Sequence, residues 1–369
     1  MHFFVAGKDL KNAIQEFDRA CIKGAVIRAT SSQTIELYGF YKPKESWGTT
    51  VRIWATVLLS RDAESAGCEP VMLRLNKFRG IPTGEVEIEA DCFGFFVNHA
   101  MYAGAIVERP PASAMCMPDL GGDICLAVNV KPEDCRAITW VLRAMDSTEE
   151  ICKRGFDRLC IREGAAEATD GIRAHRANLS FYSPEMLVPS VMADLMSRQP
   201  GELNFREDEE YESAEYRSGS IRMAATRQKC GAWPDFERLM PYGGPSVTIL
   251  PKRVLETVEY AVYGYAAATV RLSCGKGKRD LIVEGREVKA QEPPYDGPVK
   301  AVGRRVETAK LEEPCPFDDF GMGATYNAAY LADALAGFGG YAKMYYADEE
   351  SPLVLADETG RAAIVMPIV

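Results

Sequence analysis

The stretch Ala168-Thr169-Asp170-Gly171-Ile172-Arg173-Ala174 lies between a short apolar run at residues 159–161 and an alternating run at residues 175–181. An Asp-Gly pair is a strong turn signal, because glycine tolerates a positive φ and aspartate bonds to the backbone that follows it. Taken alone, the stretch predicts a strand, a tight turn and a second strand. Its threonine, aspartate and arginine crowd into one turn, which leaves a functional role open as well.

One order of elements, strand, helix, strands, helix, strands, occurs three times along the chain. Apolar residues at helical spacing and prolines in first turns mark the helices. The first helix of each repeat is predicted to begin near residues 8, 132 and 251, and the second near 70, 189 and 325. A repeat of about 120 residues is typical of tandem domains, each long enough for its own core. The sequence therefore predicts an α+β fold of three similar domains, at residues 1–120, 121–243 and 244–369.

The composition is that of an ordinary globular protein, with 369 residues of which 47% are apolar and 26% charged. No apolar run approaches the ~20 residues that span a bilayer, and the first residues lack the pattern of a secretory signal. We therefore expect a cytoplasmic protein with no membrane contact. The net charge of −10 disfavours a simple DNA-binding module, whose affinity needs a basic surface. If DNA is a partner, the positive charge must be local or the attachment must not depend on charge.

Residues that could carry catalysis or hold a metal are sparse. None of the eleven cysteines has C-x-x-C spacing, and the three histidines, His2, His99 and His175, are too scattered in the sequence for a histidine-built metal site. Neither G-x-S-x-G nor H-E-x-x-H occurs. Asp170 could be the aspartyl nucleophile of a hydrolase, but no second acid is spaced to assist it. We expect no metal site and no catalysis.

The C-terminal residues Ile364-Val365-Met366-Pro367-Ile368-Val369 are apolar to the last position, whereas chain ends are usually polar and frayed. Two readings stay open. The segment is either a final edge strand tucked into a core or one wall of an exposed apolar groove, for which adaptable methionine and non-donating proline are suited.

Four segments together resemble the bacterial DNA sliding clamp, the β subunit of DNA polymerase III. The resemblance covers the whole chain and its three-repeat order, and it is most specific in the second and third repeats. The segments are Ala168-Thr169-Asp170-Gly171-Ile172-Arg173, Trp233-Pro234-Asp235-Phe236-Glu237-Arg238-Leu239-Met240-Pro241, Tyr326-Asn327-Ala328-Ala329-Tyr330-Leu331 and Ile364-Val365-Met366-Pro367.

The resemblance implies three similar domains, each with two helices packed on antiparallel sheets, and two chains joined head to tail into a ring. Helices would line a mildly positive bore around duplex DNA, so the acidic total would be no obstacle. Phosphate contact without base readout would make the binding independent of DNA sequence. The implied DNA-facing residues are Arg74, Lys77 and Arg79 on the second helix, then Lys8, Lys11, Arg136, Arg143, Lys252 and Arg253.

The resemblance also implies a groove between the second and third domains that receives short apolar peptides of partner proteins. Its residues here would be Phe156, Thr169, Gly171, Ile172, Arg173, Ala174, Pro234, Arg238, Leu239, Pro352, Ile364, Val365, Met366, Pro367 and Ile368. The family usually has His-Arg-Leu after Asp-Gly and ends Met-Pro-Met-Arg-Leu. This chain has Ile172-Arg173-Ala174 and ends Met-Pro-Ile-Val, which predicts a shifted peptide preference.

The activity implied is that of a processivity factor without cofactor or catalysis. Its partners would be double-stranded DNA, the α subunit of DNA polymerase III, an ATP-driven clamp loader and other proteins that carry a clamp-binding motif. The homodimer would close through Tyr102, Ile106, Val262 and Tyr263. One alternative is a clamp-like scaffold of a mobile element or repair system, which genome neighbourhood would distinguish. The alternative of another class is the hydrolase that uses Asp170.

Overall fold

The computed structural model divides the chain into two compact units. Unit 1 comprises Met1–Pro132 with Val188–Gly231, and unit 2 comprises Glu133–Leu187 with Ala232–Val369. Within these bounds the structure describes residues 2–368 except 21, 23, 32, 42–49, 62–70, 79, 91–94, 102–105, 109–122, 147–154, 208–210, 229–232, 241–245, 276, 289–300, 317–318 and 321–323. The boundaries of the three expected domains stay a prediction.

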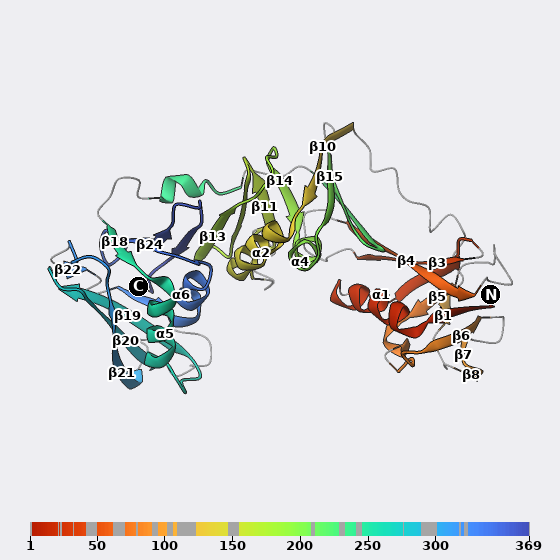
Figure 1. The fold of residues 1–369 in the computed structure, drawn as a ribbon, viewed down its shortest axis with the longest axis horizontal. Coiled ribbons are helices and arrows are strands. Elements are labelled where there is room, and N and C mark those ends of the chain that lie inside the picture. The colour runs from red at the N-terminus through yellow and green to blue at the C-terminus, as the bar shows by residue number, and fades with distance from the viewer. Residues whose placement is uncertain are drawn as a thin grey trace. The chain divides into compact units, whose positions relative to one another are not determined.

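Unit 1 is built on one antiparallel sheet, with the path β10-β15-β16-β17-β4-β1-β6-β7-β8 and with β2, β3, β5 and β9 joined to it. The helix α1 (Gly7–Arg19) buries Leu10, Ile14 and Phe17 and packs against β4 (Figure 1). The strands and remaining helices are β1 (His2–Ala6), β2 (Gly24–Ala29), β3 (Thr34–Tyr41), β4 (Thr50–Arg61), β5 (Val71–Arg74), the 3-10 helix η1 (Leu75–Phe78), β6 (Glu85–Ala90), β7 (Phe95–Val97), β8 (Ala100–Met101), β9 (Ile106–Glu108), β10 (Asp123–Val130), α4 (Ser190–Arg198), β15 (Gly201–Glu207), β16 (Tyr211–Ser218) and β17 (Ile221–Gln228).

The prediction that the second helix of the first repeat begins near residue 70 is wrong. The strand β5 occupies Val71–Arg74, and only the short η1 follows it. Val71 and Leu73 are buried while Arg74 is exposed, which is the alternation of a strand with one buried face. β5 pairs with both β2 and β9, so strand partners distant in sequence decide the conformation of a segment that is too short for a stable helix of its own.

Unit 2 contains an eight-stranded sheet in the order β14-β11-β12-β13-β26-β25-β24-β18 and a five-stranded sheet formed by β19 to β23. Helices α5 and α6 contact each other (Figure 1). The elements are α2 (Pro132–Val141), the 3-10 helix η3 (Leu142–Ala144), β11 (Arg158–Arg162), β12 (Ala165–Thr169), β13 (Arg173–Asn178), β14 (Met186–Pro189), the 3-10 helix η4 (Phe236–Leu239), β18 (Ser246–Ile249), α5 (Pro251–Ala261), β19 (Ala268–Gly275), β20 (Asp280–Val288), β21 (Ala301–Lys310), β22 (Asp319–Phe320), β23 (Thr325–Asn327), α6 (Ala328–Leu335), β24 (Ala342–Tyr345), β25 (Leu353–Ala356) and β26 (Ala362–Val365).

The middle third of the chain contributes strands to both units. In unit 1, β17 pairs with β4 from Ile221↔Ala55 to Thr226↔Thr50. In unit 2, β13 pairs with β26 from Arg173↔Val365 to Arg176↔Ala362. The last strand is therefore central, between β13 and β25, and the reading of it as an edge strand is wrong.

The other predicted helices are confirmed. Pro132 and Pro251 each open a helix, as suits a residue that has no N–H to donate and a fixed φ. The helix expected from residue 325 begins later, at Ala328, because the three residues before it pair with β19. Asn327 caps this helix, and its side-chain oxygen accepts from the N–H groups of Ala329 (3.0 Å) and Tyr330 (3.3 Å). Within the residues that the structure describes, no helix is long and apolar enough to cross a membrane.

Candidate functional site

The Thr169–Arg173 turn joins β12 to β13 and is held together by its own side chains. Asp170 Oδ1 accepts from the N–H groups of Ile172 and Arg173, both at 2.9 Å. Thr169 Oγ1 donates to the carbonyl of Arg173 (2.6 Å) and accepts from the N–H of Gly171 (3.0 Å). Gly171 has φ of +88°, a conformation that a side chain disfavours. The predicted strand, turn and strand are thus confirmed.

Arg173 is engaged within unit 2. Its Nε donates to Asp170 Oδ2 at 3.0 Å, and its Nη1 donates to Asp333 Oδ2 of α6 at 2.8 Å. The guanidinium lies 4.0 Å from the ring centre of Tyr330, also on α6. Because the arginine side chain is only 11% exposed, we infer that it fixes α6 to the turn more than it offers hydrogen bonds to a ligand.

A second set of contacts joins α2, β13 and α6 through Trp140, His175 and Asp333. The two rings stack at 4.7 Å, and Trp140 Nε1 donates to the carbonyl of Asp333 at 2.9 Å. A side chain at Gly337 would overlap the indole, so the close approach of α6 requires glycine there. His175 is fully buried, and its Nδ1 is 3.1 Å from the carbonyl oxygen of Trp140.

His175 should make the stability of unit 2 depend on pH. Burial lowers the pKa of its imidazole from 6.5 to about 4, against the opposing effect of the Trp140 carbonyl. The unfolded chain takes up the proton as the pH falls below 6.5, but the folded chain does not until about pH 4. The contribution of His175 to the free energy of unfolding is therefore complete above pH 6.5, and it is lost as the pH falls from 6.5 to about 4.

The measurement is urea unfolding of the protein and of the His175→Gln variant at pH 7 and pH 5. Between these values the parent should lose about 2 kcal/mol more than the variant. An equal loss in both proteins would contradict the assignment of a neutral, buried imidazole.

Four exposed apolar side chains mark a surface of unit 2 that we call the apolar patch: Ile172 (51% exposed), Leu239 (46%), Met366 (36%) and Ile368 (47%). The N–H of Met366 donates to the carbonyl of Ile172 at 2.9 Å, so these two residues are neighbours at the end of the β13–β26 pair. The N–H of Ile368 donates to the carbonyl of Thr325 at 2.7 Å, which fixes the chain after β26.

The residues of the apolar patch lie close in sequence to members of a buried core cluster that contains Ala174, Ile364, Trp233 and Phe236. Ala174 follows Ile172 by two positions, and Ile364 precedes Met366 by two, at the adjoining ends of β13 and β26. Phe236 begins η4, which ends at Leu239. The patch residues are therefore exposed apolar positions on segments that also supply this buried cluster.

The other residues expected in the groove lie on the same elements with varied exposure. Phe156 is half-buried and contacts Trp233 edge to face at 6.0 Å. Arg238 is 85% exposed and pairs with Asp235 at 3.0 Å, so its guanidinium is accessible. Gly171 is exposed, Pro234, Pro352 and Pro367 are half-buried, and Thr169 and Val365 are buried with the two core residues Ala174 and Ile364.

Most residues expected to face DNA lie on helices and are accessible. Lys8 is exposed and Lys11 half-buried on α1, Arg136 is exposed on α2, and Lys252 and Arg253 are exposed in the first turn of α5. Cations at a helix N-terminus gain nothing from the helix dipole, so the positions of Lys8, Lys252 and Arg253 do not follow from helix stability. Their role stays a prediction.

Of the other four basic residues expected to face DNA, the structure describes three. Arg143 is exposed in η3 and pairs with Asp333 at 3.4 Å. Arg74, expected on a helix, is exposed on the strand β5. Lys77 lies in η1, and Arg79 lies outside the described residues.

The residues expected at the dimer contact are partly described. α5 ends at Ala261, so Val262 and Tyr263 follow the helix; Val262 is half-buried and Tyr263 is 76% exposed. Ile106 begins β9, and Tyr102 lies outside the described residues.

Sequence reasoning missed Tyr330 and Asp333, which hold Arg173 from α6. The two residues are three apart on a helix and so project from one face, which is the signal that was available. Their partner lies in the predicted second domain, and no local pattern connects the two segments.

Comparison with known proteins gives the class to which the fold belongs. No family model matches the chain, and no curated protein matches it in sequence. Solved structures match over full length, and their fold is that of bacterial DNA polymerase III β sliding clamps.

Three of these structures illustrate the likeness. The Caulobacter crescentus polymerase III β subunit is 17% identical with a TM-score of 0.73. The Pseudomonas aeruginosa DNA polymerase III subunit β is 18% identical with a TM-score of 0.70. The Helicobacter pylori β clamp, bound to a DNA ligase peptide, is 13% identical with a TM-score of 0.72. Each alignment covers 100% of this chain and 100% of the other.

Proposed function

We propose that the protein is a sliding clamp that encircles duplex DNA as a homodimeric ring and tethers a replicative DNA polymerase. The observation that carries the proposal is the full-length match to the clamp fold, with a TM-score of 0.73 at 17% identity. A match of that length at so low an identity supports a shared architecture and agrees with the resemblance that four segments of the sequence carry. Within that architecture we retain three domains with the boundaries 1–120, 121–243 and 244–369.

The charge distribution is consistent with a ring that holds DNA by topology. A net charge of −10 would repel DNA from an open surface. In a closed ring, exposed basic residues on helices, such as Lys8, Arg136 and Lys252, need only balance the phosphates in the bore. The attachment would then be independent of DNA sequence, because no base edge needs to be read.

We propose that the apolar patch binds a short peptide of the polymerase, the clamp loader or repair proteins. The Helicobacter pylori clamp was solved with a DNA ligase peptide, so a protein of this fold accepts a peptide ligand. Met366 and Leu239 offer adaptable apolar contacts, and the exposed Arg238 can hold a carbonyl or an acidic side chain of the ligand.

The protein acts as a scaffold without catalysis in this proposal. The hydrolase alternative needs an accessible Asp170, but that side chain is 3% exposed and both of its oxygens serve the turn and Arg173. A nucleophile must reach its substrate, and this carboxylate faces its own backbone. The mobile-element or repair scaffold uses the same surfaces, and genome neighbourhood distinguishes it from the replicative role.

The mass in solution tests the proposal. Sedimentation equilibrium at micromolar concentration should give about twice the chain mass of 40.7 kDa. Tyr263→Asp should shift the equilibrium toward the monomer, while the equally exposed Tyr182→Asp should not. A strict monomer in the parent protein would count against ring formation.

A further inference from the structure

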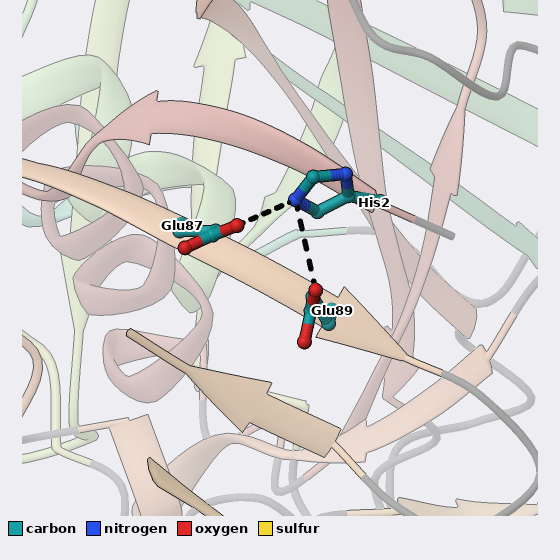
Figure 2. A group of neighbouring side chains, drawn as sticks. All are labelled: His2, Glu87 and Glu89. Carbon is teal, nitrogen blue, oxygen red and sulfur yellow. Dashed lines mark hydrogen bonds and ion pairs between the residues drawn. The ribbon is translucent and has the colours of Figure 1, made fainter. Parts of the chain in front are cut away.

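Two of the three histidines meet two glutamates on the outer face of unit 1. His2 Nε2 lies 2.7 Å from Glu87 Oε1 and 3.8 Å from Glu89 Oε1, and Figure 2 shows the three side chains converging. His99 Nε2 lies 3.1 Å from the other oxygen of Glu87. The histidines are scattered in the sequence, but strand pairing brings His2 next to Glu87 and Glu89, so carboxylates can complete a site that histidines alone could not.

We propose that His2, Glu87 and Glu89 form a binding site for a divalent transition-metal ion, with Zn²⁺ as the fitting example, and that His99 holds the second oxygen of Glu87. Imidazole nitrogen and carboxylate oxygen are ligands that Zn²⁺ accepts at about 2.0–2.2 Å. Two ligands of a tetrahedral ion are then about 3.4 Å apart. The spacings of His2 Nε2 to the two carboxylates, 2.7 and 3.8 Å, lie on either side of that value.

The strands set this geometry. β1 pairs with β6 in the register His2↔Glu89 and Phe4↔Glu87, so His2 faces one glutamate directly and the other diagonally. The alternate residues Phe3 and Ile88 are buried, which directs the three ligand-bearing positions of the two strands, His2, Glu87 and Glu89, to the opposite face. The three ligand atoms of His2, Glu87 and Glu89 all lie within 4.8 Å of one another.

The turn that carries His99 is fastened to the same glutamate. Asn98 donates its N–H to the carbonyl of Glu87 and accepts from the N–H of Glu87, both at 2.9 Å. His99 has φ of +64°, in the left-handed region where glycine is the usual choice for a two-residue hairpin turn. Backbone strain of this kind concentrates at functional sites, and here it presents an imidazole to the cluster.

Ordinary surface ion pairing is the competing explanation, and the same face provides an example of it. Glu85, the next outward residue along β6, pairs with Arg61, whose guanidinium lies 4.5 Å from the ring centre of Phe4. Glu87 and Glu89 instead face imidazoles, which bind metal ions when neutral. A site with an imidazole nitrogen ligand also favours Zn²⁺ or Co²⁺ over Mg²⁺ or Ca²⁺, which prefer oxygen.

The test is calorimetric titration of the full-length protein with Zn²⁺, and with Co²⁺ as a spectroscopic probe, under reducing conditions. The parent should bind one ion at this site, and Glu87→Gln should weaken that binding at least about tenfold. His99→Asn, which tolerates the left-handed backbone, should weaken it as well, because it removes the imidazole that holds the second oxygen of Glu87. Glu85→Gln is the matched control on the same strand and face, and its affinity should equal that of the parent.

The proposal does not depend on the clamp function, because the readout is metal affinity and not DNA or peptide binding. The Co²⁺ spectrum should lack a thiolate charge-transfer band, and X-ray absorption should report imidazole scattering. Binding that is unchanged in Glu87→Gln and His99→Asn, or a thiolate spectrum common to all variants, would assign the metal to cysteine and overturn the proposal. Absence of binding at millimolar Zn²⁺ would overturn it equally.

Discussion

Replacing Leu239 and Met366 together with aspartate is expected to weaken binding of a polymerase-derived peptide roughly a hundredfold. Both side chains are exposed, at 46% and 36%, so their replacement leaves the packed core intact. Each substitution removes apolar contact and places a charge against the apolar anchor of the peptide. Fluorescence anisotropy with a labelled peptide from the polymerase of the same organism measures the change in Kd.

The matched control is Val306→Asp, since Val306 is 49% exposed on β21 in the same unit and outside the apolar patch. It should leave the peptide Kd within about twofold, well below the effect of one hot-spot contact. Equal weakening by the control would indicate a general loss of structure. Unchanged affinity in the double variant would mean that the peptide binds elsewhere.

Asp170→Ala is expected to destabilise unit 2 by about 3–5 kcal/mol. The substitution removes two backbone acceptor contacts at 2.9 Å and leaves Arg173, whose side chain is only 11% exposed, with a single carboxylate partner. Asp170→Asn keeps an oxygen for the backbone N–H groups and loses the charge, so its cost should be intermediate. Urea unfolding followed by the fluorescence of Trp140 and Trp233, both in unit 2, reports the change.

A surface turn of the same kind provides the control for that variant. Asp357 accepts from the N–H groups of Thr359 (2.9 Å) and Arg361 (3.0 Å) and also shapes a turn. The hydrogen bond from Thr359 to Asp357 is exposed to solvent. Asp357→Ala should therefore lower the free energy of unfolding by only about 1 kcal/mol. Equal losses at both positions would show that the buried ion pair of Arg173 contributes little.

The same structure shows which parts of the fold local sequence can predict. Helical periodicity and first-turn prolines located α1, α2, α4 and α5, because both signals act within a few residues. The helix predicted after residue 70 is wrong, because β2 and β9 supply the hydrogen bonds of this segment from distant parts of the chain. The central position of β26 depends in the same way on pairing with β13, which is nearly two hundred residues earlier.

In the candidate site, too, contacts between residues close in sequence were predictable and contacts between distant residues were not. The Thr169–Arg173 turn followed from the Asp-Gly signal, since its contacts are between residues at most four apart. The engagement of Arg173 by Asp333 did not, because that contact joins residues 160 apart. The cluster of His2 and Glu87 likewise joins residues 85 apart, and only the register of β1 with β6 brings them together.

Retention on DNA tests the central claim most directly. The protein is loaded onto nicked circular plasmid by the clamp loader of the same organism with ATP, and the complex is separated by gel filtration in high salt. We predict that the protein stays with the circle and is released when a restriction enzyme linearises the DNA, because a ring slides off a free end. Retention on linear DNA equal to that on circles, or loss from circles as soon as salt is raised, would contradict topological encirclement.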